Sequence, residues 1–256
     1  MALSDYQQIE YIEGVNGAYI NSGQAFTRYR LVSARFNFKV LDTVKYIYGV
    51  DDGTRRFNFR YSDSDSAYIW NFGNRSATQP ANLTPLYNAD TDLDMTQQQT
   101  ASNRYTVYLT DGNTTLSSYC SIPTSATSAS INTFIMARNN SGSATGYAVG
   151  SRLYEIRIFD PRNNTETDVF HGIPIREKSG VTPKVGLYDL VSDAPFWSAT
   201  ATNFVAGPDI GGGGTQIYIK VGGVWVLGDP YIKVNGNWEP AEDVFIKTGG
   251  NWEPAA

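Results

Sequence analysis

Apolar and polar residues alternate with a period of two in several separate segments of this chain. The clearest segment covers residues 30–40, where polar residues separate Val32, Ala34, Phe36, Phe38 and Val40. Successive side chains of a β-strand point to opposite faces of a sheet, so this pattern predicts a strand with one buried face.

The same alternation recurs in three further segments. The residues expected to point inward are Phe57, Phe59 and Tyr61, then Tyr105, Val107 and Leu109, and then Tyr154, Ile156 and Ile158. Turn sequences such as "DDG", "TDGN" and "ARNNSGS" stand between such segments and supply residues that tolerate positive φ. No helical periodicity extends beyond a turn or two. Many half-buried strands without crossover helices predict an all-β fold, a two-sheet antiparallel jelly-roll sandwich over residues 1–210.

The composition changes near residue 210. Four consecutive glycines stand at positions 211–214, and the segment 211–216 has no apolar residue to anchor it. Such a sequence is typical of a flexible linker. We therefore expect a domain boundary here.

Residues 217–256 contain one short sequence motif three times, as "IYIKVGGVWVL", "PYIKVNGNWEP" and "VFIKTGGNWEP". Gly-Gly and Asn-Gly suit the two-residue type I′ turn of a β-hairpin, so the segment predicts three hairpins in series. A single hairpin is marginal in water, and these are expected to pack on one another, on the sandwich or on another chain. The expected docking or oligomerisation residues are Tyr218, Trp225, Tyr231, Trp238, Phe245 and Trp252, with sugar contact as the alternative role of the tryptophans.

Composition and charge exclude several functions. The chain has 256 residues, 13% of them aromatic, and a net charge of −5 with no cluster of Lys or Arg among aromatic residues, which argues against nucleic-acid binding. No apolar run reaches the length of about 20 residues that a membrane span needs, and the first residues do not form a signal peptide. Cys120 is the single cysteine, so no intrachain disulfide forms and a buried thiol is expected.

Three segments of the sequence resemble parts of a known protein family. They are "YIEGVNGAYINSGQAF" at residues 11–26, "FIMARNNSGSATGYAVGSRLYEIRIFD" at 134–160 and "VGLYDLVSDAPFWSATATNFVAGP" at 185–208. In this order they resemble the opening, late and closing sections of laminin G-like, concanavalin A-like jelly-roll domains, whereas residues 62–103 match less well. The resemblance implies the sandwich fold, which serves in glycan binders, adhesion modules and structural spacers.

The terminal repeats are similar to those of tailed-bacteriophage structural proteins. This resemblance implies a virion component that is made in the host cytoplasm without a signal peptide. It would be a head or tail fibre or a capsid decoration. Its expected partners are other virion proteins and copies of itself, with a trimer as the expected oligomer.

The sequence does not indicate an enzyme. Related glycoside hydrolases use two carboxylates from a Glu-x-Asp-x-x-Glu pattern, and the nearest match here, from Glu166 to Asp168, has no third carboxylate in register. His171 is the only histidine, which excludes a metal site built from several histidines. We expect this histidine at the surface or at a strand edge.

Calcium is the one candidate ion, because laminin G-like domains sometimes hold it on a rim of the sandwich. Carboxylates that alternate in a loop can converge on such a hard cation. Asp51 and Asp52 are the expected ligands, and further acidic loop residues are Asp63, Asp65, Asp90, Asp92 and Asp94.

A glycan site needs aromatic faces and planar polar groups at a loop-lined edge. Two segments supply such residues, and the candidates are Tyr68, Trp70, Asn71 and Arg75 with Arg138, Asn139 and Asn140. The alternation in "YIWNFGNR" equally allows Tyr68 and Trp70 to be core residues, and both roles stay open.

Taken together, the sequence predicts a non-enzymatic virion structural protein. Its sandwich would be displayed for adhesion to a host-surface glycan, and its hairpins would attach it to the particle, although the opposite orientation is also open. The alternative is a soluble carbohydrate-binding protein, or a degenerate glycanase, that is not built into a particle.

Overall fold

The structure is a computed structural model, and its chain divides into two units, Met1–Pro208 and Asp209–Ala256, which are described separately. It describes residues 2–74, 81–83, 89–101, 103–121, 128–162 and 166–210, and then 217–221, 224–228, 231–234, 237–240, 245–248 and 251–254. Side chains are described only within the first unit and its short extension to residue 210.

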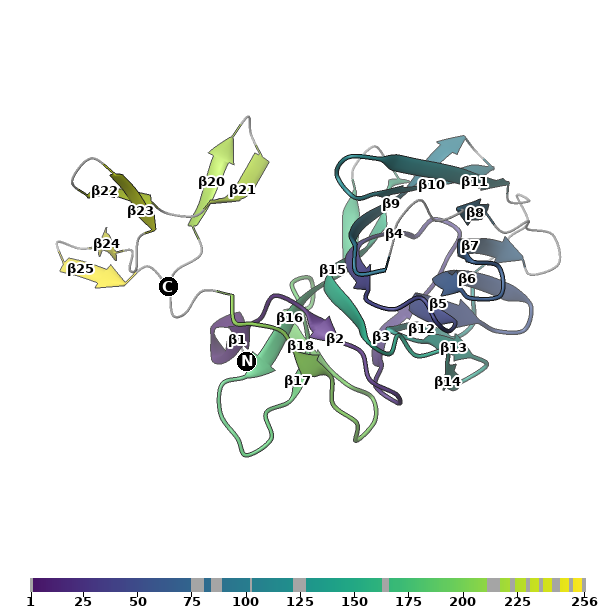
Figure 1. The fold of residues 1–256 in the computed structure, drawn as a ribbon, viewed down its shortest axis with the longest axis horizontal. Helices are drawn as coiled ribbons and strands as arrows, with labels where there is room; N and C mark the ends of the chain where they lie inside the picture. Colours follow the sequence, from purple (N-terminus) through teal and green to yellow (C-terminus); the bar gives the residue numbers. More distant parts are fainter. Residues whose placement is uncertain are drawn as a thin grey trace. The chain divides into compact units, whose positions relative to one another are not determined.

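Two sheets form the first unit, in which the described residues contain no α-helix and one 3-10 turn, η1 (Leu3–Asp5) (Figure 1). The larger sheet has eleven strands in the order β11-β10-β9-β4-β15-β16-β17-β18, with β1 beside β16 and β2 between β15 and β19. These strands are β1 (Tyr6–Gln8), β2 (Ile12–Glu13), β4 (Leu31–Phe38), β9 (Asp92–Ala101), β10 (Arg104–Thr110), β11 (Thr115–Ser121), β15 (Ser151–Asp160), β16 (Thr167–Glu177), β17 (Val185–Asp189), β18 (Ala194–Trp197) and β19 (Val205–Ala206).

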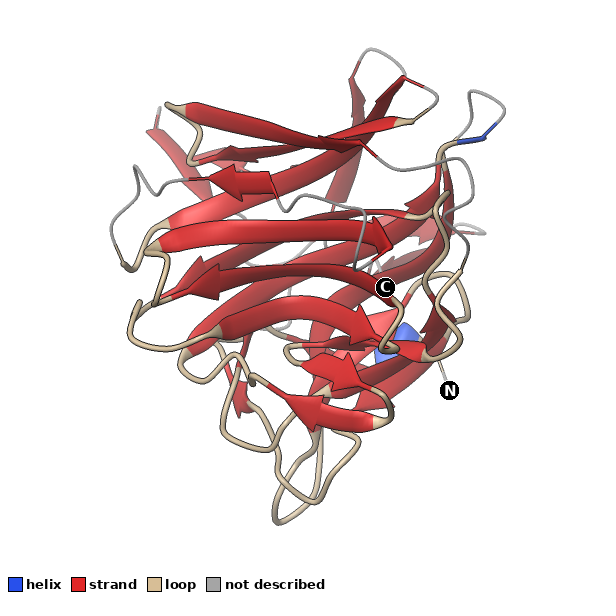
Figure 2. Ribbon diagram, turned by 90° about the vertical axis from the view of Figure 1, so that its right-hand side faces the viewer, coloured by secondary structure: helices blue, strands red, loops and turns tan. Residues whose placement is uncertain are grey.

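The smaller sheet has eight strands in the order β14-β13-β5-β6-β7-β8, and β12 lies between β3 and β5. Its strands are β3 (Ile20–Ala25), β5 (Lys45–Asp51), β6 (Arg55–Ser62), β7 (Ala67–Asn74), β8 (Ala81–Leu83), β12 (Asn132–Ile135), β13 (Arg138–Asn140) and β14 (Ser143–Thr145). All named strand pairs are antiparallel except β13 with β5. The predicted all-β, two-sheet sandwich is therefore confirmed, and Figure 2 shows its layers of strands.

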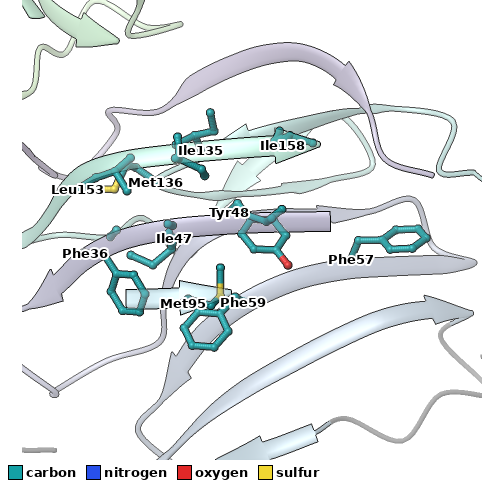
Figure 3. Packing of buried hydrophobic residues seen from close by; sticks show 14 of the residues in the cluster. Phe36, Ile47, Tyr48, Phe57, Phe59, Met95, Ile135, Met136, Leu153 and Ile158 are labelled. Carbon is teal, nitrogen blue, oxygen red and sulfur yellow. The ribbon is translucent and has the colours of Figure 1, made fainter. Parts of the chain in front are cut away.

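Aromatic rings from both sheets fill the space between them (Figure 3). The ring of Phe36 on β4 lies 5.6 Å from that of Phe59 on β6, and Phe38 stacks on Tyr68 at 5.9 Å. The alternation of the sequence places these rings inward, because every second side chain of each strand faces the other sheet. The single cysteine, Cys120, is also buried, and burial raises the pKa of its thiol to about 12.

Two residues that the sequence predicts to face inward do not face inward in the structure. Val40 lies beyond the end of β4 and is 49% exposed. On β15 the register against β4 shifts between Leu153 and Glu155, so Leu153 is buried and Tyr154 turns toward the outer face. A β-bulge of this kind inserts one extra residue and re-aims the side chains beside it, which strict alternation does not predict.

One buried polar contact joins the sheets. Gln97 on β9 is fully buried, accepts a hydrogen bond of 3.0 Å from the backbone N–H of Val32 and donates to the hydroxyl of Tyr48 on β5. Buried polar atoms need such partners, because an unpaired one loses the hydration that it has in the unfolded chain.

The second unit contains three separate two-stranded antiparallel pairs. They are β20 (Ile217–Val221) with β21 (Val224–Gly228), β22 (Tyr231–Val234) with β23 (Asn237–Pro240), and β24 (Phe245–Thr248) with β25 (Asn251–Pro254). Each pair aligns the repeat in the same register, with Lys opposite Trp. The expected linker 211–216 lies outside the described residues, as do the residues between the paired strands.

Candidate binding site on the outer face of the larger sheet

Charged side chains form cross-strand rows on the outer face of the larger sheet. Arg35 on β4 pairs with Asp94 on β9 on one side and with Glu155 on β15 on the other. Two residues further along β15, Arg157 pairs with His171 on β16. Directly opposite residues of antiparallel strands have Cβ atoms about 4.5–5.5 Å apart, so these five residues form one continuous polar surface, here called the sheet-face site.

The imidazole of His171 lies between two carboxylates. Its Nε2 atom is 2.6 Å from Oε1 of Glu155, and its Nδ1 atom is 3.6 Å from Oδ2 of Asp168. Asp168 in turn accepts hydrogen bonds of 3.3 and 2.9 Å from Nε and Nη2 of Arg157. The hydrogen bond with His171 lowers the pKa of Glu155, because it favours the ionised carboxylate.

The opposite end of the row has a different electrostatic environment. Desolvation against the sheet raises the pKa of Asp94, the charge of Arg35 opposes this effect, and the charges of Asp92 and Glu155 add to it. The two carboxylates of the row therefore have pKa values shifted in opposite directions, and Nη2 of Arg35 lies 3.3 Å from Oδ2 of Asp92.

Two tyrosine rings adjoin the sheet-face site. The rings of Tyr11 and Tyr154 meet edge to face at 5.6 Å, and the guanidinium of Arg35 lies 5.2 Å from the centre of the Tyr154 ring. The hydroxyl of Tyr154 donates a hydrogen bond of 2.8 Å to Oδ1 of Asp92. Burial and this hydrogen bond raise the pKa of Tyr154 to about 12, so the ring stays neutral and holds its position.

A shallow hollow of about 310 Å³ lies over the row. It is lined by Ser33, Ala34, Arg35, Asp94, Met95, Thr96, Glu155 and Arg157. Its planar charged groups can exchange paired hydrogen bonds with neighbouring hydroxyls, and the adjacent rings can contact apolar C–H faces. This combination fits a polyhydroxylated ligand.

The residues expected at the glycan site do not come together. Tyr68 and Trp70 are 1% and 0% exposed, so the role as sugar platforms is wrong and their alternative role as core residues is correct. They belong to the inward face of β7, whereas Asn71 lies on its outer face and donates a hydrogen bond of 3.0 Å to Asn58. Arg75 lies outside the described residues.

The other three glycan candidates are at β13. Asn139 is buried, donates to the carbonyl of Asn132 at 2.7 Å and accepts from the N–H of Gly142 at 2.8 Å, which makes it a structural residue of this turn. Asn140 is exposed beside it, and Arg138 lies on the outer face of the smaller sheet.

Asp51 and Asp52 do not fit a calcium ion. Oδ2 of Asp51, which is 1% exposed, lies 2.7 Å from Nη2 of Arg56 and 3.7 Å from Nη1 of Arg138. Asp52 accepts hydrogen bonds from the backbone N–H groups of Thr54, Arg55 and Ser130. Calcium requires six to eight oxygen ligands, while guanidinium and amide groups already occupy these carboxylates, so the calcium prediction is wrong here.

Among the residues that the structure describes, no group of three or more His, Cys, Asp or Glu side chains is placed to hold a metal ion. The same part of the chain contains no helix that is long and apolar enough to cross a membrane. The aromatic residues expected to dock the hairpins lie in described strands whose side chains are outside the description.

The sequence did contain a signal for the sheet-face site. Arg35 and Arg157 occupy polar positions of segments that were predicted as half-buried strands, and His171 is the only histidine. The sequence pattern does not show which strands are neighbours, however, and the bulge that brings Tyr154 to this face breaks the alternation.

Fold and site together define an all-β sandwich with a polar outer face on its larger sheet. No protein-family model matches the chain, and no curated protein matches it. Among solved structures it is similar to domains LG4-5 of the mouse laminin alpha1 chain, with a TM-score of 0.46 and 13% identity over 64% of this chain and 44% of that one. The aligned part thus spans less than half of the laminin chain.

The chain is also similar to scytalido-glutamic peptidase in complex with a transition state analog inhibitor, with a TM-score of 0.34 and 14% identity over 70% of this chain and 97% of that one. A further similar structure is SCP-B of the Eqolisin family of peptidases, with a TM-score of 0.31 and 12% identity over the same shares. These are similarities in the arrangement of strands, and no residue role is taken from them.

Proposed function

We propose that this chain is a non-enzymatic, glycan-binding structural protein of a bacteriophage particle. The observation that carries the binding role is the placement of the Tyr11–Tyr154 ring pair beside the row of Asp94, Arg35 and Glu155. Sugars present hydroxyls at their edges and C–H groups on their faces, and this surface offers a matching partner for each. Host-surface polysaccharide is the ligand class that fits best.

The role in a particle rests on the second unit and on the resemblance of its repeats to phage structural proteins. Three hairpins with one repeated register suit repeated docking to other virion proteins, or assembly of several copies of this chain, with a trimer as the expected oligomer. The sandwich would then be displayed outward on a fibre or as a capsid decoration.

A glycan array followed by calorimetry tests the binding role. We expect wild-type protein to bind at least one bacterial surface polysaccharide, and R35Q and E155Q each to bind it about tenfold or more weakly, because each removes charge-assisted hydrogen bonds. The matched control is R162Q, since Arg162 lies over the ring of Tyr29 and pairs with Asp160 away from the row. Equal affinity of R35Q, E155Q and wild type would refute the site.

The particle role has a separate test. The chain should be found by mass spectrometry in purified virions, and a version that ends at Ile210 should no longer attach to particles that lack the protein. Attachment of the shortened chain would show that the sandwich is the anchor and that the hairpins are exposed.

A degenerate or active glycanase is the second candidate. Asp94 and Glu155 have pKa values shifted in opposite directions, and one strand separates them, which corresponds to about 9–10 Å between their backbones. Inverting glycosidases hold their two carboxyl groups about 6.5–9.5 Å apart, a separation between side chains rather than between backbones. Release of reducing sugar by wild type and its loss in D94N would establish this activity in place of simple binding.

A further inference from the structure

The outer face of the smaller sheet holds three arginines around one tyrosine. Arg60 on β6 pairs with Tyr46 on β5, and Arg56 lies four residues before Arg60 on the same outer face. The guanidinium carbons of Arg60 and Arg138 lie 5.6 and 5.2 Å from the centre of the Tyr46 ring. Arg56, Arg60 and Arg138 are here called the arginine cluster.

A glycine allows the strands to bring these side chains together. A Cβ atom on Gly49 would lie 3.1 Å from the Cβ and Cγ atoms of Arg138, so the arginine occupies the space above this residue of β5. In this position the Nε atom of Arg138 donates a hydrogen bond of 3.3 Å to Oγ1 of Thr145. Its Nη1 atom lies 3.7 Å from Oδ2 of Asp51.

The positive charges of the cluster exceed the negative ones. Among the described residues, Asp51 is the one carboxylate that forms ion pairs with the arginine cluster, and it is shared between Arg56 and Arg138. None of the ion pairs among the described residues includes Arg60, whose Nη1 atom donates to Oδ1 of Asn58 at 3.3 Å. Burial lowers the pKa of Arg60, the charges of Arg56 and Arg138 lower it further, and Tyr46 and the charge of Asp65 oppose this shift, although a guanidinium stays protonated at neutral pH.

A buried amide lies beside Arg60 on this face. Asn58 is fully buried, and its Oδ1 atom accepts hydrogen bonds from Asn71 as well as from Arg60. Its Nδ2 atom is buried and has no acceptor within the described part of the chain. Asn58 is too deeply buried to contact a ligand itself, whereas the excess positive charge of the guanidinium groups favours an oxyanion, which supplies both hydrogen-bond acceptors and negative charge.

We infer that the arginine cluster binds an anionic group of an acidic polysaccharide, namely a carboxylate or a sulfate or phosphate ester on a sugar. Tyr46 is 4% exposed and lies against the guanidinium groups of Arg60 and Arg138, so the arginine side chains and not this ring meet the sugar that carries the anion. An acidic peptide fits less well, because none of the exposed large apolar residues of the described chain lies on β5, β6 or β7. This inference concerns the sheet opposite the sheet-face site and does not depend on the proposed function.

Binding of defined polymers to the full chain tests the inference. The probes are polygalacturonate, dextran sulfate, uncharged dextran and poly-glutamate, measured by calorimetry at low and at high salt. We expect both acidic polysaccharides to bind, dextran not to bind through this face, and the affinity to fall as salt screens the charges. R60Q should weaken the binding of acidic polysaccharide about tenfold or more.

Three variants make the result specific. R60K keeps the charge but loses the planar fork of donors, so its affinity should lie between those of wild type and R60Q. R162Q is the matched control, because it removes an arginine that also lies over a tyrosine ring but pairs with its own carboxylate. R35Q removes the arginine of the sheet-face site, and in this background R60Q should weaken the binding of acidic polysaccharide by the same factor as in wild type. Thermal unfolding confirms that each variant is folded.

Equal affinity of wild type and R60Q for both acidic polysaccharides would overturn the inference. Loss of binding in R35Q but not in R60Q would assign the acidic ligand to the sheet-face site instead. If poly-glutamate binds as tightly as the polysaccharides and its binding depends equally on Arg60, the arginine cluster binds an acidic peptide instead. Failure of the glycan-array test with R35Q and E155Q, by contrast, would leave the inference about the arginine cluster unaffected.

Discussion

The Nε2 atom of His171 lies 2.6 Å from the Oε1 atom of Glu155, across the contact between β16 and β15. The two residues are sixteen positions apart in the chain and are not directly opposite in the register, since His171 pairs with Arg157. Their contact is therefore a diagonal one, and it joins the histidine to the row that contains Arg35 and Asp94.

Replacement of His171 by Gln should raise the pKa of Glu155. The imidazole hydrogen bond favours the carboxylate, so in the folded protein Glu155 titrates below its ordinary value of 4.5. Its contribution to stability is then present above the pKa of the unfolded chain and is lost as the pH falls through the lower folded pKa. A carboxyl chemical-shift titration of Glu155 in wild type and H171Q measures the change, and an unaltered titration would contradict the contact.

Replacement of Asp51 by Asn should destabilise the fold, and calcium should not restore it. Removing this carboxylate leaves Arg56 and Arg138 without their shared partner, at a cost of about 2–3 kcal/mol, below the full value for a buried pair because Arg56 retains 21% exposure. Urea unfolding gives the free energy. A melting temperature of wild type that rises with added calcium would instead support an ion at this rim.

Replacement of Trp70 by Ala should lower the free energy of unfolding by about 3–5 kcal/mol, because it empties a site of 0% exposure between the sheets. Trp70→Phe keeps most of the volume and should cost less. Glycan affinity of the folded fraction should equal that of wild type in both variants. A selective loss of glycan binding without loss of stability would return Trp70 to the ligand site.

Replacement of Gln97 by Leu should leave two buried groups without a partner, the N–H of Val32 and the hydroxyl of Tyr48. Each unpaired group should lower the free energy of unfolding by about 1–3 kcal/mol. The neighbouring Gln98 is exposed, so Q98L should change stability by no more than about 0.5 kcal/mol. Chemical denaturation of the two variants side by side makes the comparison. Equal stability of Q97L and Q98L would show that the buried amide contributes little.

Much of the sandwich was predictable because several of its strands alternate with a period of two. Phe36, Phe59 and Val107 are all buried as the alternation indicates. The exception at Tyr154 arises from a register shift against β4, which depends on the partner strand rather than on the sequence of β15 alone.

The candidate glycan residues show a similar division. The alternation in β7 allowed Tyr68 and Trp70 to be core residues, but only the stacking of Tyr68 on Phe38 from the opposite sheet decides the question. In the sequence, the acidic pair Asp51 and Asp52 resembled a cation site. The sequence does not show that arginines on β6 and β13 form ion pairs with Asp51.

The sequence by itself determined the class of fold and the presence of repeated hairpins, since alternation and turn chemistry act between residues that are close in the chain. Only the tertiary structure decided which charged and polar side chains lie close together. The sheet-face site takes Arg35, Asp94, Glu155 and His171 from four strands, and the arginine cluster takes its members from β6 and β13. β4, β9 and β15 are neighbours in the sheet but distant in sequence, and the contacts between their charged groups follow from sheet order and register, which no local pattern encodes.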